Sequence, residues 1–66
     1  MDDKLLKGIL LVDTLKKRFE KLDIKVSAIG QFRGDVIIYL KDISDAVWIK
    51  EFLMEDEVDL VKFFKS

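Results

Sequence analysis

Cysteine, histidine and proline are absent from this chain of 66 residues, and asparagine is absent as well. Without cysteine there is no disulfide and no thiolate ligand, and without histidine the usual ligand sets of zinc sites cannot be assembled. The same absences exclude cysteine nucleophiles, histidine bases and Ser-His-Asp triads within one chain. We therefore expect no metal and no cofactor, and we predict that the protein is not an enzyme.

Long hydrophobic runs are missing too. The longest is Val36–Leu40, whereas a membrane-spanning helix needs about 20 apolar residues. The opening residues Met1-Asp2-Asp3 do not have the pattern of a signal peptide, so we expect a cytoplasmic protein without a membrane partner. The single glutamine, the lack of asparagine and the abundant lysine are typical of a thermophile.

The length and composition favour one small folded domain over residues 1–66. Half of the residues are hydrophobic and the net charge is −1. This composition is too apolar and too weakly charged for a disordered chain. A domain of this size buries only about 60 % of its unfolded surface, and small domains usually add disulfides, a metal or a partner. Because the sequence excludes disulfides and the usual metal sites, association with another chain is the remaining source of additional stability.

Three stretches have the periodicity of regular structure. Residues 3–22 predict a helix with the core stripe Leu11, Val12, Leu15, Phe19 and Leu22. Gly8 lies on the same side, where it permits close approach of another backbone. Residues 24–40 alternate as a β-hairpin, with a turn over residues 31–34, a left-handed Gly34 and a G1-type bulge. Residues 43–54 predict a second helix, with Asp42 as its N-cap.

Residues 55–66 leave two interpretations open. The acidic run Glu55-Asp56-Glu57 suits the start of a helix, whereas Val58, Leu60 and Lys62 can alternate as a strand. We favour the helix. The predicted fold is therefore α+β, in the order helix, β-hairpin, helix and a short C-terminal helix (or strand), completed by homodimerisation.

Apolar residues exceed what one copy of this fold can cover. The first helix has a second apolar side at its start, the second hairpin strand is apolar on both faces, and the second helix is apolar nearly all round. We predict a homo-oligomer, with a dimer favoured and two hairpins meeting across a two-fold axis. The predicted contact with a second copy or a protein partner consists of Leu6, Leu10, Ile37, Tyr39 and Trp48. The alternative is a monomer in which the last twelve residues cover the excess.

The function that follows is a non-enzymatic, self-associating assembly or protein-interaction module. The alternative is a small nucleic-acid-binding regulator that uses the basic end of the first helix. Its candidate residues are Lys16, Lys17, Arg18, Lys21, Lys25 and Arg33. The nearly balanced charge favours a simple solvated helix end. The acidic residues Glu55 to Asp59 lack a calcium-loop pattern and are interpreted as a solvated segment.

Overall fold

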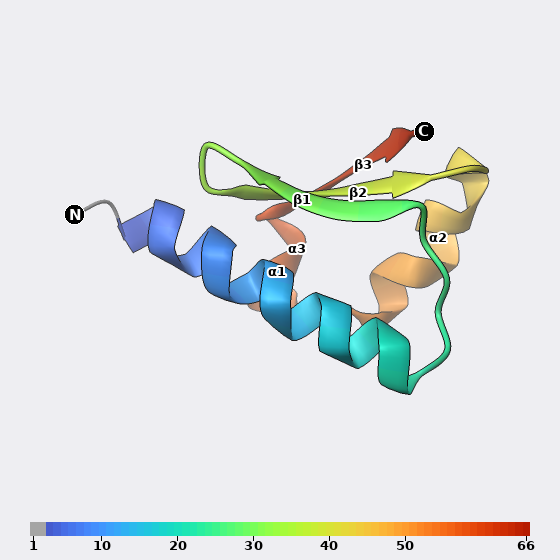
Figure 1. Ribbon diagram of the computed structural model, residues 1–66, viewed down its shortest axis with the longest axis horizontal. Helices are drawn as coiled ribbons and strands as arrows, with labels where there is room; N and C mark the ends of the chain where they lie inside the picture. Colours follow the sequence, from blue (N-terminus) through green and yellow to red (C-terminus); the bar gives the residue numbers. More distant parts are fainter. Residues whose placement is uncertain (1–2) are drawn as a thin grey trace.

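The computed structural model describes residues 3–66. Helix α1 (Asp3–Lys21) leads into the hairpin of β1 (Ala28–Phe32) and β2 (Asp35–Leu40). Helical turns follow as η1 (Ile43–Asp45), α2 (Ala46–Ile49) and η2 (Lys50–Phe52), and then α3 (Glu55–Val58) and β3 (Val61–Lys65) complete the chain. Figure 1 shows the helices on one side of the sheet, with α1 crossing beneath the hairpin. The predicted α+β class is confirmed.

The sheet is mixed and has β2 in its centre. Strand β1 pairs antiparallel with β2, and β3 pairs parallel with it on the other side. Two parallel neighbours need a crossover between them, and the segment from η1 to α3 provides it. The residues of β2 that face the helices, Val36, Ile38 and Leu40, are buried against Leu15, Phe19 and Ile49. This one-sided core leaves the opposite face of the sheet without a helical layer.

The close approach predicted for Gly8 is confirmed. A Cβ atom at Gly8 would lie 2.4 Å from the carbonyl oxygen of Gly34, so α1 touches the hairpin turn with its bare backbone. The turn itself has two central residues, Arg33 with φ 52° and Gly34 with φ 89°. Gly34 is left-handed as predicted. The predicted turn over residues 31–34 and the predicted bulge are wrong, because Phe32 still pairs with Asp35. Two positive φ values in a two-residue loop match the twist of the strands without an extra residue.

Several predicted boundaries are corrected. The first strand begins at Ala28 rather than at residue 24, because only residues 28–32 have partners on β2. The second helix ends at Phe52, and its two ends are 3₁₀ turns. Its predicted cap is confirmed, since the Asp42 carboxylate accepts a hydrogen bond from the Ser44 amide at 3.0 Å. Leu22 lies beyond the end of α1 and is 47 % exposed rather than in the core.

The C-terminal segment contains both of the alternatives. A single helical turn, α3, carries the acidic run, and β3 follows it. The preference for a helix is therefore wrong for Val61–Lys65. These residues form a strand because of a distant partner: the second edge of β2 has backbone N–H and C=O groups that need hydrogen-bond partners from an adjacent strand.

The end of α1 is a Schellman motif built on an aspartate. The amide of Ile24 donates to the carbonyl of Phe19 at 2.8 Å, and that of Asp23 donates to Glu20 at 3.2 Å, with Asp23 at φ 57°. Glycine is favoured there, and a carboxylate opposes the helix dipole. We expect Asp23→Gly to stabilise the fold by about 1 kcal/mol, measured as a higher urea midpoint with an unchanged m-value. An unchanged or lower midpoint would contradict this account of the helix end.

Candidate interaction surfaces

The outer face of the sheet is an apolar surface without a covering helical layer (Figure 1). Alternation along the strands turns Phe32, Ile37, Tyr39 and Phe64 to this side. Phe32 is 61 % exposed and Phe64 is 52 % exposed. The rings of Tyr39 and Phe64 lie side by side, with centroids 6.4 Å apart. An antiparallel hairpin usually turns polar residues to water on such a face, so this exposed aromatic face is a candidate interaction surface.

A shallow hollow lies within this face. It has a volume of about 580 Å³, and its lining includes the backbone of the strand centre and three aromatic rings. The lining residues are Gly30, Gln31, Phe32, Ile37, Tyr39, Phe64 and Lys65. Gly30 faces Ile37 across the ladder, and a Cβ atom on Gly30 would meet nothing within 4 Å. The absence of a side chain at this position leaves the hollow open.

The five residues of the predicted contact lie on different surfaces. Ile37 is only 8 % exposed, because β3 places Lys62 beside it and continues the face with Phe64; its burial within one copy is a correction to the sequence interpretation. Tyr39 remains exposed on the outer sheet face.

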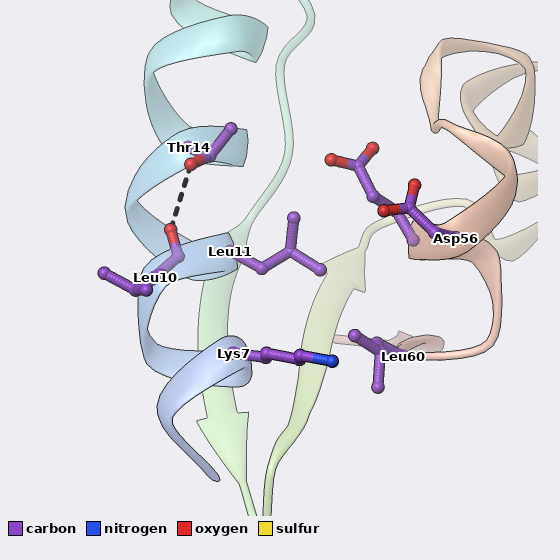
Figure 2. Close-up of a pocket in the computed structure, with 7 residues that line it drawn as sticks. Lys7, Leu10, Leu11, Thr14, Asp56 and Leu60 are labelled. Atoms are coloured by element: carbon purple, nitrogen blue, oxygen red, sulfur yellow. Dashed lines mark hydrogen bonds between the residues drawn. The ribbon is translucent and has the colours of Figure 1, made fainter. Parts of the chain in front are cut away.

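The other three predicted contact residues belong to the helical layer. Leu6 and Leu10 are exposed on α1, and Figure 2 shows Leu10 pointing away from α3 while Leu11 points toward it. Trp48 is 42 % exposed and donates its indole N–H to the Asp45 carboxylate at 3.1 Å. No single flat contact joins these residues to Tyr39.

The two edges of the sheet differ in charge. Strand β3 carries Lys62 and Lys65, and lysines on an edge discourage pairing with another strand. Strand β1, with the sequence Ala-Ile-Gly-Gln-Phe, has neither charge nor proline. The amide of Val36 donates to the carbonyl of Leu60 at 2.7 Å, toward β3. Its register partner Gln31 therefore directs its own backbone groups away from β2, to the open edge.

An apolar strip of α1 lies on the same side as the open edge of β1. The opposite flank of α1 faces α3, where Arg18 binds Glu57. Helical spacing places Leu5 and Ile9 on the flank turned away from α3. This is also the flank on which Lys16 borders a hollow shared with Ile29 of β1. Leu5 is 40 % exposed and Ile9 is 52 % exposed, so the first half of this flank is apolar beside the edge, whereas Lys16 lies farther along it.

The structure does not bring the predicted basic cluster together. Arg33 lies in the hairpin turn, beside the start of α1, where Lys4 binds Asp35 at 3.4 Å. Residues 16–21 lie at the far end of α1, a dozen or more residues from Lys4, or about 20 Å at ~1.5 Å per residue. Lys17 is paired with Asp13 on the helix surface at 3.2 Å. Lys16, Lys21 and Lys25 are exposed at that far end.

Arg18 is engaged inside the molecule. Its guanidinium donates to both carboxylate oxygens of Glu57, at 2.7 and 3.1 Å, and to the carbonyl of Phe52 at 3.1 Å. Glu57 is the one buried charged residue of the described chain, 3–66. The hydrogen bond from Arg18 lowers the pKa of this carboxyl, burial opposes that effect, and the Met54 amide lowers the pKa further. This pair fastens α3 to α1.

The remaining acidic residues of the described range form no metal site. Within residues 3–66, no group of three or more carboxylates is arranged to hold a metal ion, and no helix in that range is long and apolar enough to cross a membrane. Comparison with protein-family models, curated proteins and solved structures finds no match to this chain.

Proposed function

We propose that the protein is a non-enzymatic assembly module that forms a homodimer by pairing β1 with β1 of a second copy. The observation that carries the proposal is the open, uncharged edge of β1. Edge strands in natural proteins are normally protected by lysine, proline, bulges or a covering segment. Here the other edge, β3, has two lysines, whereas Ala28–Phe32 has none of these side-chain protections.

Two-fold antiparallel pairing suits this strand. With the axis at Gly30, Ile29 of each copy opposes Gln31 of the other, and these are the residues whose backbone groups face the edge. No charged side chain opposes another of its own sign, whereas self-pairing of β3 would bring lysines together. Self-pairing of β1 is therefore more favourable than self-pairing of β3.

Two further features support a partner at this edge. Leu5 and Ile9 are exposed on the same side, so pairing of the strands brings apolar side chains of α1 into the contact. A continuous sheet of six strands would also remove the weakness of a small three-stranded sheet.

The test compares the parent with two edge variants by light scattering over a dilution series. Gln31→Pro removes an outward-facing N–H, which an edge strand tolerates within one copy, and Ala28→Lys adds a charge to the same strand. We expect the parent to be a dimer and each variant to raise the dissociation constant about tenfold or more. The proline removes two backbone hydrogen bonds per dimer, worth ~1 kcal/mol each, and the lysine places a charge in the contact. Circular dichroism of each variant checks that it is folded.

Leu10→Asp is the matched control, since Leu10 is exposed on α1 but is not part of the edge. We expect this variant to keep the mass of the parent. If Leu10→Asp disperses the dimer and both edge variants leave it intact, the contact is on the outer side of α1 and the edge proposal is wrong. A parent that is monomeric throughout the series also contradicts it.

A further inference from the structure

We propose that the outer face of the sheet binds single-stranded nucleic acid, with bases stacked on its aromatic rings and phosphates held by the lysines and arginine at its rim. This surface differs from the open edge of β1 and from the basic end of α1. The inference stands on the hollow, the rings around it and the distribution of charge.

The rings suit stacking on bases. Phe32 is at the turn end of the face, and Tyr39 and Phe64 are together at the other end. Tyr39 is four residues along β2 from Asp35, the partner of Phe32, or about 13 Å at ~3.3 Å per residue. Aromatic side chains on an open surface bind the unstacked bases of single strands, and each base has an apolar face to offer.

The hollow between the rings suits a planar ring system. Its floor is Ile37 and the bare backbone of Gly30, and its lining is mostly apolar. A glycine inside a strand is destabilising and often marks the close approach of a ligand. Nothing within one copy occupies the space over Gly30, so packing within the fold does not explain why this residue is glycine. Close approach of a nucleic-acid base explains it.

The charge of this face is positive although the chain is nearly neutral. Arg33 lies over the ring of Phe32 at 5.1 Å, and Lys62 is exposed beside Ile37. Lys65 pairs with Leu40, whose side chain faces the helices, and lies near Asp42, but it also borders the hollow at the end of β3. The carboxylate of β2, Asp35, is neutralised by Lys4. Most other acidic residues are on α1 or in the segment from η1 to α3, which belong to the other layer.

The spacing of the cations favours a strand over a single nucleotide. Lys65 pairs with Leu40, five residues along β2 from Asp35 at the turn, which is about 16 Å at ~3.3 Å per residue. One phosphate cannot reach both Lys65 and Arg33. A chain of phosphates can, and an A-form or B-form duplex would present no free base faces to the rings.

The experiment measures fluorescence anisotropy of labelled 12-nucleotide DNA and RNA single strands, and of the DNA duplex. We expect the single strands to bind more tightly than the duplex. Three cations predict a slope of about −2 in log affinity against log salt, from roughly −0.7 per neutralised phosphate, or about 20-fold weaker binding at about 200 mM than at about 50 mM salt. Tyr39→Ala and Phe64→Ala should each weaken binding about fivefold or more.

Gly30→Val is the decisive variant, because a Cβ atom at this position meets nothing within 4 Å and the valine methyl groups extend into the hollow. It should retain or raise the melting temperature and lose binding about tenfold or more. Trp48→Ala and Lys17→Ala are controls, since both side chains are exposed in the helical layer, and they should bind like the parent.

Absence of binding near 50 mM salt overturns the inference, as does unchanged binding by Gly30→Val and Phe64→Ala. Equal affinity for the duplex, with a loss in Lys17→Ala, places nucleic acid on the basic end of α1 instead and also overturns it. Light scattering on the same samples separates this test from that of the dimer. A change of mass in Phe64→Ala would mean that the face is a contact between copies, which contradicts the inference.

Discussion

Replacing Gly8 with alanine is expected to destabilise the protein by about 2–3 kcal/mol, although alanine is the better helix former. The new methyl group would lie 2.4 Å from the carbonyl oxygen of Gly34 and 2.8 Å from its carbonyl carbon. Both are backbone atoms of a tight turn whose own φ values are fixed, so neither can move aside as a flexible side chain would. Helix and turn must separate, and packing along α1 is lost.

Gly30→Ala is the matched control for that substitution. Its methyl group meets no atom within 4 Å, so we expect the free energy of unfolding to stay equal or rise by about 0.5–1 kcal/mol. Thermal denaturation at a fixed protein concentration measures both variants, and a loss of 2–3 kcal/mol lowers the midpoint by roughly 10–20 °C in a domain of this size. Equal midpoints for the two variants would show that the contact of Gly8 with the turn is not tight.

Glu57→Ala is expected to lower the free energy of unfolding by about 3 kcal/mol. The carboxylate accepts two hydrogen bonds from Arg18 and a third from the Met54 amide at 2.8 Å. Its side chain is 11 % exposed and that of Arg18 is 22 % exposed, so its removal leaves a largely buried cation without its counter-charge and the Met54 amide without an acceptor. Urea denaturation measures the loss. The exposed pair Asp13–Lys17 is the control, and Asp13→Asn should change stability by less than about 0.5 kcal/mol.

The same carboxylate makes stability depend on pH in a defined direction. The folded state lowers the pKa of Glu57, mainly through the hydrogen bond from Arg18. Its stabilising contribution is therefore complete above the unfolded value of ~4.3 and is lost as the pH falls through the lower folded value.

Glu57→Gln isolates this contribution. We expect parent and variant to differ most near neutral pH and to converge in acid. The side chain and amide of Ser44 lower the pKa of Asp42. Asp42 is present in both proteins, so its contribution cancels in the difference between their stabilities. A difference between parent and variant that stays constant down to pH ~2 would contradict the assignment.

Local features of the sequence were sufficient to predict part of this fold. The spacing of Leu11, Leu15 and Phe19 predicts the buried side of α1, and the glycine at position 34 predicts a left-handed turn residue. The cap on Asp42 needs only the residues next to it. Each of these depends on contacts within a few residues or on a single periodicity.

The features that sequence patterns missed depend on distant partners. Val61–Lys65 becomes a strand because the second edge of β2 is open beside it, which no local pattern of the segment reveals. The same strand buries Ile37 within one copy. The sequence patterns do not predict the aromatic face: they include Tyr39 in the expected contact, but they place Phe32 in the turn and Phe64 on a helix. Recognising that Ala28, Gly30 and Phe32 alternate with Ile29 and Gln31 would have extended the face across β1.

The claim that β1 joins two copies is tested most directly by an isotope-filtered NOE spectrum of a mixture of labelled and unlabelled protein. In such a sample, cross-peaks arise only between protons of different copies. Pairing of β1 across an axis at Gly30 predicts cross-peaks between Ala28 and Phe32 and between the two Gly30 residues, with others from Ile9 of α1. Cross-peaks confined to Leu10 or Trp48, or a spectrum without any at millimolar concentration, would contradict it.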